Sequence, residues 1–128
     1  MNVKSNLIAL TSFSIMMALS INSHAGQLLK CEKRTTGRER SRISVNIEDQ
    51  TPGALYTALV TSKTNTAQST RAANFAGKAE FDFDSNRKDV AAGATQITKN
   101  FIDGTVSVMV TDALGNVVEQ DTMTCKIK

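Results

Sequence analysis

The sequence predicts an all-β protein: an antiparallel Ig-like β-sandwich of about seven strands. Apolar and polar residues alternate with a period of two in several runs, as they do in half-buried strands. Gly, Pro and Asn occur between these runs, where hairpins need residues that tolerate tight turns. Two Cys lie near the ends of a domain of about 100 residues, the size of such a sandwich. A small closed β-barrel is the alternative architecture.

Residues 1–25 have the features of a cleaved secretory signal peptide. Lys4 gives a short basic region, residues 7–21 are apolar and uncharged, and Ser-His-Ala at residues 23–25 fits a small-x-small cleavage site. The apolar run of about 15 residues falls short of the ~20 that cross a bilayer. We therefore expect residues 26–128 to form a single β domain, periplasmic or secreted, without a transmembrane segment.

The composition argues against most catalytic chemistry. The single His, His24, lies in the expected signal peptide, so the mature domain would contain no imidazole. That excludes His-based triads, His-ligated zinc and a His pH switch. Neither a Gly-x-Ser-x-Gly motif nor a phosphate loop nor a His-Glu-x-x-His motif occurs. We expect a protein that is not an enzyme, with a His-independent enzyme as the minor alternative.

Cys31 and Cys125 are expected to form one disulfide. Export would bring them to a compartment where disulfides persist, and two cysteines allow only one intramolecular pair. The bridge would close a loop of about 95 residues and stabilise the domain by roughly 4–5 kcal/mol on the chain-entropy estimate. It requires the first and last strands to lie within ~6–7 Å of each other at these positions.

The first half of the domain contains two clear strands around a turn. Ile43, Val45 and Ile47 alternate with polar residues, and Thr-Pro-Gly at residues 51–53 marks a tight turn because Pro fixes φ and Gly tolerates a positive φ. Residues 54–63 form the next strand. Its two faces are expected to carry Leu55 and Leu59 on one side and Tyr56, Ala58 and Val60 on the other.

The second half repeats the pattern. Residues 79–84 alternate Ala or Phe with acidic residues, and after Asp103-Gly104 three valines share one face: Val106, Val108 and Val110. Leu-Gly-Asn at residues 114–116 turns the chain into the last strand. The inward set expected there is Val117, Met123, Cys125 and Ile127, with a bulge near Glu119 and Asp121.

Two stretches allow more than one structure. Residues 64–78 are polar and Ala-rich, which fits a long hairpin or one helical turn. Residues 86–93 fit a short helix with Ser85 or Asn86 as N-cap and Gly93 at its C-terminal end.

Two segments resemble known families. Residues 108–118, with Thr-Asp-Ala-Leu-Gly-Asn, look like the closing hairpin of bacterial Ig-like domains. Residues 79–104, together with the terminal Thr-Cys, resemble small exported bacterial proteins of unknown function. The resemblance implies export and a Cys-bridged β domain, and it supplies neither an activity nor site residues.

One cluster of oxygen-bearing side chains resembles the start of a calcium loop: Asp82, Asp84, Asn86 and Asp89. Arg87 stands where a calcium loop needs Gly, and Gly93 stands where it needs Glu. The same residues also fit a solvated strand face followed by a helix cap, with Asp89 favoured in the first turn. No cofactor is therefore expected, and a calcium-stabilised structural domain is kept as an alternative.

The strongest charge asymmetry lies at the start of the domain. Residues 26–42 carry six basic and two acidic residues, whereas residues 43–128 carry eight and ten. The candidate binding residues are Lys33, Arg34, Arg38, Arg40 and Arg42. Arg38, Arg40 and Arg42 would share one face of an extended chain. Such a face could bind an acidic protein or an envelope polyanion, or it could protect an edge strand from aggregation.

The expected function is therefore that of a binding or structural module. Nucleic acid is not an expected partner, because no aromatic residue for base stacking lies between Phe13 and Tyr56. The identity of the partner and the oligomeric state are left open.

Overall fold

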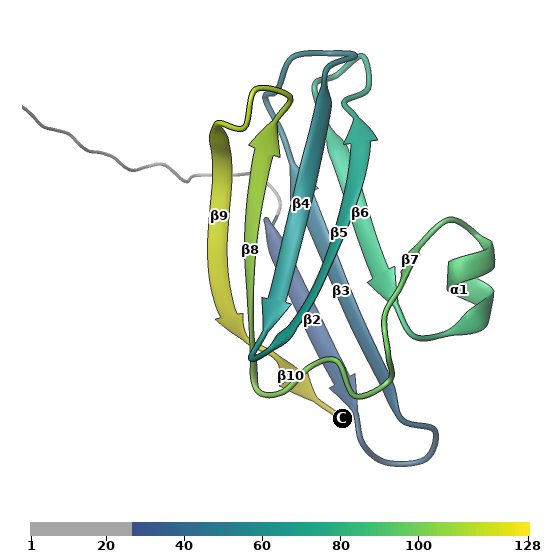
Figure 1. Cartoon of the computed structure of the whole chain (residues 1–128). Coiled ribbons are helices and arrows are strands. Elements are labelled where there is room, and N and C mark those ends of the chain that lie inside the picture. The colour runs from purple at the N-terminus through teal and green to yellow at the C-terminus, as the bar shows by residue number, and fades with distance from the viewer. Residues whose placement is uncertain (1–26) are drawn as a thin grey trace, which may run out of the picture.

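The computed structural model describes residues 27–128, so the expected signal peptide and His24 lie outside the described residues. Two β-sheets face each other and a short helix lies beside them (Figure 1). The first sheet contains, from one edge to the other, β10 (Lys126–Ile127), β2 (Leu29–Arg34), β3 (Arg40–Ile47), β6 (Ala79–Asp84) and β7 (Thr95–Gln96). The second contains β5 (Asn65–Ala72), β4 (Leu55–Ser62), β8 (Thr105–Asp112) and β9 (Val117–Thr124). The architecture is thus the predicted all-β sandwich, and the closed barrel is not formed.

The chain alternates between the sheets. β2–β3, β4–β5 and β8–β9 are antiparallel neighbours that follow each other directly, while β6 returns from the second sheet to pair with β3 and β8 returns to pair with β4. Within residues 27–128 the long strands number seven, and they pair with one another only antiparallel. The short strands β7 and β10 differ from the prediction, because each adds parallel to its neighbour at an edge of the first sheet.

The core lies between the sheets and follows the predicted alternation. β3 buries Ile43, Val45 and Ile47, and β6 buries Phe81 and Phe83 against them. The facing strands of the second sheet bury the residues that were expected to share faces: Tyr56, Ala58, Val60, Val106, Val108 and Val110. Because side chains alternate along a strand, Leu55 and Leu59 share the opposite face of β4, as predicted, and the structure shows that this face points outward.

The local signals for turns and for the helix are confirmed. Gly53 has φ 80°, and the N–H of Ala54 donates to the carbonyl of Thr51 at 3.1 Å. Residues 64–78 form the hairpin alternative, with β5 paired along the whole of β4. Helix α1 (Arg87–Ala91) begins at the N-cap Asn86, whose side chain accepts from the Lys88 N–H at 2.9 Å.

The inward set of the last strand is partly wrong. Val110 pairs with Glu119 whereas Thr111 pairs with Val117, so Val118 is an extra residue in β9. This bulge turns Val118 toward the core and leaves Val117 50% exposed, because one added residue reverses the facing of those that precede it. Met123 and Cys125 do face inward. Ile127 is 59% exposed because β10 continues past the end of the second sheet, where no strand covers it (Figure 1).

The predicted disulfide joins the two sheets. Cys31 lies on β2, and Cys125 lies where the chain leaves β9 in the second sheet and enters β10 in the first. Their Cα atoms are 4.9 Å apart, within the predicted limit, and both residues are buried.

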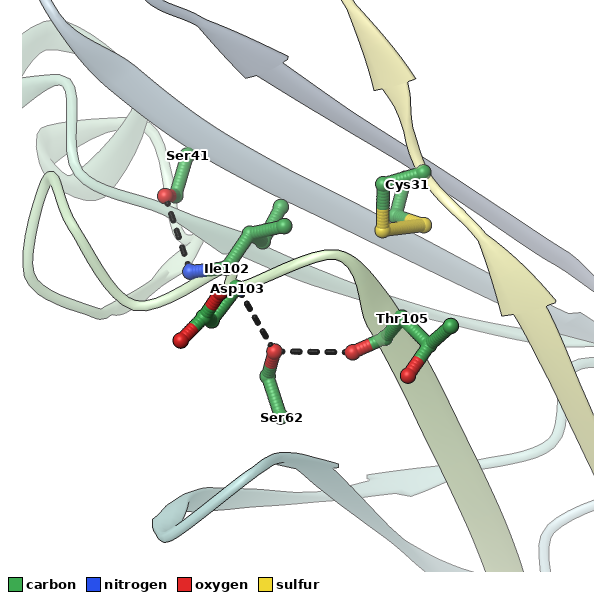
Figure 2. The surroundings of a disulfide bond; sticks show 7 residues. Cys31, Ser41, Ser62, Ile102, Asp103 and Thr105 are labelled. Atoms are coloured by element: carbon green, nitrogen blue, oxygen red, sulfur yellow. Dashed lines mark hydrogen bonds between the residues drawn. A yellow bond between two sulfur atoms is a disulfide. The ribbon is translucent and has the colours of Figure 1, made fainter.

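Two buried serines hold the segment that crosses between the sheets near this bridge (Figure 2). Ser41 Oγ on β3 donates to the carbonyl of Lys99 at 2.8 Å and accepts from the N–H of Ile102 at 3.2 Å. Ser62 Oγ on β4 donates to the carbonyl of Thr105 and accepts from the N–H of Asp103, both at 2.8 Å. The backbone of residues 99–105 therefore has hydrogen-bond partners at positions where strand pairing of β7 and β8 does not supply them.

No helix among residues 27–128 is long and apolar enough to cross a membrane.

Candidate functional site

The predicted basic and acidic clusters lie side by side on the outer face of the first sheet. Since Ile43, Val45 and Ile47 point into the core, the intervening residues of β3 point outward, beginning with Arg40 and Arg42. β6 follows the same rule, so Asp82 and Asp84 point outward next to them. The register pairs Arg42 with Asp84 and Ser44 with Asp82.

Arg40 is bound to two of the acidic residues. Its Nε and Nη2 donate to the two carboxylate oxygens of Asp84 at 2.9 and 2.6 Å, and Nη2 also lies 2.7 Å from Asp89 Oδ2. Asp84 is only 2% exposed although it belongs to an outer face, because helix α1 follows β6 directly and brings Asp89 to the same guanidinium.

The ionised form of Asp84 is favoured despite its burial. Burial by itself raises the pKa of this carboxyl group, but the hydrogen bonds from Arg40 and from the Asn86 N–H outweigh it and hold the pKa below its usual value. The hydrogen bonding between the Arg40 side chain and Asp84 also raises the pKa of Arg40. This ion pair is structural. The carboxylates of Asp84 and Asp89 neutralise the charge of Arg40, so Arg40 attracts a ligand only weakly.

The calcium cluster is arranged around a cation that the protein itself supplies. Asp84 and Asp89 meet at Arg40, and Asn86 caps α1 next to them. Asp82 lies two residues earlier on β6, where it accepts a hydrogen bond from Ser44 Oγ at 3.0 Å. Within the described part of the chain, no group of three or more His, Cys, Asp or Glu is placed to hold a metal ion.

Lys33 lies on the other side of the sheet from the arginines. It is buried, and its Nζ donates to the carbonyl of Lys99 at 3.2 Å and lies 3.3 Å from Glu39 Oε2. Arg38, unlike Lys33, is not on a strand. It lies in the exposed loop between β2 and β3, so only Arg40 and Arg42 share a strand face as predicted.

Several basic residues of this face surround a small cavity of about 160 Å³. It is lined by Glu32 and by four basic residues: Arg34, Arg40, Arg42 and Lys128. Arg34 stands directly opposite Arg40 in the β2–β3 register and has no ion pair within residues 27–128. Arg42 is 56% exposed in its side chain, and its Nε is 3.9 Å from Asp84.

Lys128 belongs to this cavity although the basic segment of the sequence did not include it. β10 adds parallel to β2, and the backbone N–H of Lys128 donates to the carbonyl of Lys33 at 2.8 Å. The Lys128 side chain then reaches Glu32, with Nζ 2.9 Å from Oε2, and this hydrogen bond lowers the pKa of Glu32. Only the parallel pairing of two distant segments creates this contact, so no local pattern could reveal it.

A larger groove of about 720 Å³ adjoins the small cavity, since Glu32 and Arg42 line both. It runs beside β2 toward the end of β9, and it adds Lys30 and Lys126 to the basic residues of this face together with one further acid, Glu80. The outer face along β2 thus has five exposed cations in one continuous depression: Lys30, Arg34, Arg42, Lys126 and Lys128.

The sequence matches no protein-family model and no curated protein.

Proposed function

We propose that this protein is an exported β-sandwich module that binds a polyanion of the cell envelope in the depression along β2. The observation that carries the proposal is the cavity where Arg34, Arg42 and Lys128 converge beside Glu32. Arginine donates through a planar fork that fits phosphate and carboxylate groups, and two such forks at one cavity favour an anion over a neutral ligand.

The neighbouring ion pair supports this role for Arg42 and Arg34. Because Asp84 and Asp89 are already bound by Arg40, they compete weakly for the other two guanidinium groups. The Arg40 side chain also fills the space between β3 and α1, so it forms a fixed wall of the cavity.

The shape of the site favours a chain with repeated charges. The small cavity is large enough for one phosphate or carboxylate group, and the adjoining groove carries Lys30 and Lys126 further along β2. A linear polyanion would place successive charges along this line, and its affinity would fall with rising salt because the contacts are exposed.

Binding of inorganic polyphosphate to the oxidised protein, measured by calorimetry over a range of salt concentrations, tests the proposal. We expect Arg34→Ala combined with Arg42→Ala to weaken binding at least ~10-fold and to reduce its salt dependence. The matched control is Arg87→Ala combined with Lys88→Ala, which removes the same charge from exposed positions on α1. Equal weakening in both double variants, or binding that salt does not change, would contradict the proposal.

A further inference from the structure

The outward-facing register positions of the four strands of the second sheet hold no charged residue. The registers of β5, β4, β8 and β9 place Thr, Ser, Gln, Ala, Leu, Met and Val side by side on this face. The charged residues of β9, Glu119 and Asp121, pair with the inward-facing Val110 and Val108 and so belong to the other face. The first sheet is the opposite case, since its outer face is dominated by charged residues.

An apolar centre lies in the middle of this uncharged face. Leu59 on β4 pairs with Met109 on β8, and their exposed fractions are 38% and 41%. Gln68 flanks Leu59 on β5 and Gln120 flanks Met109 on β9, so one row across all four strands is apolar in the middle and polar at both ends. A shallow hollow of about 450 Å³ lies here, with Leu59, Met109 and Gln120 among its lining residues, and the exposed Asp121 borders it on β9.

The hydroxyl groups around this centre already bond to one another. Thr57 Oγ1 lies 2.8 Å from Thr70 Oγ1, and Ser107 Oγ lies 2.8 Å from Thr122 Oγ1. A polar group that has a partner within its own surface loses less when water is removed than one that depends on water. The face can therefore be covered by a neutral surface at a low desolvation cost.

We propose that this uncharged face docks onto the same face of a second copy of this chain, with Leu59 and Met109 at the centre of the contact. An apolar centre inside an uncharged polar rim is the arrangement of protein interfaces, whose centres are depleted in charge. At the two-fold axis of such a contact residues meet their own equivalents, and uncharged residues at that position avoid repulsion between like charges.

The area of the face agrees with a weak dimer. Strands about 4.8 Å apart with a rise of about 3.3 Å per residue make a four-stranded face of eight-residue strands cover roughly 500 Å². Two copies would bury about 1,000 Å², which is the lower limit for a specific interface. The dimer should therefore form in the micromolar-to-millimolar range and leave the cavity along β2 exposed on both outer surfaces.

Sedimentation of the oxidised protein over a concentration series from about 10 μM to about 1 mM tests the proposal. We expect a monomer–dimer equilibrium in this range, and we expect Met109→Lys to raise the dissociation constant at least ~10-fold because two charges then meet near the two-fold axis. Leu114→Lys is the matched control. Leu114 is 87% exposed in the β8–β9 turn, outside the face, and its substitution should leave the dissociation constant unchanged.

A wild-type protein that stays monomeric throughout the series, or a dimer that Met109→Lys does not weaken, would overturn the proposal. A second measurement needs no variant: on dilution, amide chemical shifts should change along β4 and β8. Shifts that change along β2 and β3 instead would also overturn it. Binding of polyphosphate and dimerisation use opposite faces, so either proposal can fail while the other holds.

Discussion

Arg40 and Asp84, 44 residues apart in the sequence, form a two-point contact in which Nε and Nη2 of the arginine meet both carboxylate oxygens. Asp84 is almost completely buried and Arg40 partly so, because α1 covers the end of β6 and supplies Asp89 as a second acceptor. The contact joins β3, β6 and α1. It also uses Arg40, a residue of the basic segment, for an internal ion pair.

Arg40→Ala should lower the free energy of unfolding by about 2–4 kcal/mol, since it leaves the Asp84 carboxylate buried without its cation. Urea unfolding at neutral pH measures this loss. Arg38→Ala, in the exposed β2–β3 loop, should change it by less than about 0.5 kcal/mol. Similar losses in the two variants would show that the ion pair is not what stabilises this corner.

The pH dependence of stability should reflect Asp84. Its pKa is lowered in the folded protein, so the folded state binds a proton less readily than the unfolded chain, whose Asp pKa is about 3.9. The stabilisation is therefore fully present above about pH 4 to 5 and is lost as the pH falls through the folded pKa.

Asp84→Asn should remove that part of the pH dependence. The variant should be less stable than the wild type at neutral pH, and the difference in unfolding free energy should shrink as the solution is acidified. Thermal melts from pH 7 to about pH 2 measure both curves. A difference that stays constant over this range would contradict the assignment.

Calcium should bind to this corner only when Arg40 is removed. In the wild type the guanidinium already neutralises Asp84 and Asp89, so the melting temperature should not change between calcium and EDTA. In Arg40→Ala the two carboxylates lose that cation, and calcium should then raise the melting temperature. Chelator-sensitive melting of the wild type would instead favour the calcium-stabilised domain.

Removal of the disulfide should cost about 4–5 kcal/mol by the chain-entropy estimate for a loop of this length, with smaller measured values expected if the reduced chain keeps residual structure. The double variant Cys31→Ala, Cys125→Ala avoids a free thiol. Urea unfolding of this variant and of the oxidised wild type gives the difference, and a loss below ~1 kcal/mol would mean that the sheets hold together without the bridge.

Ser41→Ala and Ser62→Ala should each lower the unfolding free energy by about 1–3 kcal/mol, because the first leaves the buried Ile102 N–H without its acceptor and the second removes the hydrogen bonds to Asp103 and Thr105. Thr98→Ala is the control, since Thr98 is an exposed residue of the same segment. The prediction is wrong if all three variants unfold at the same urea concentration.

The periodic part of the sequence predicts most of the fold. Alternation over Ile43–Ile47 and the valines of β8 identifies buried faces because the geometry of a strand requires it. The failures lie where that period breaks. At Val118 one extra residue changes the facing of β9, and Ile127 belongs to a two-residue strand that the second sheet does not cover. A bulge is expected near Glu119 and Asp121, but the sequence does not locate it at Val118, and the two-residue strand has no local pattern of its own.

The site was harder to predict because its charges are set by distant partners. The basic segment contains Lys33 and Arg40, but Lys33 turns inward to Lys99, and Arg40 is bound by carboxylates from β6 and α1. Lys128 joins the cavity only because β10 pairs with β2. The number of charges along a segment does not reveal which of them pair with distant residues. The disulfide could be predicted because each of the two cysteines has only one possible partner.

The position of the disulfide also determines how the domain responds to tension. The bridge joins Cys31 on β2 to Cys125, which directly follows β9 and lies 94 positions further along the chain. A pulling force that reaches Cys31 and Cys125 passes along the covalent sulfur bond and bypasses the hydrogen bonds of the strands between these two residues. Under load the oxidised domain should therefore behave as a short, inextensible link, and the reduced domain as an extensible one.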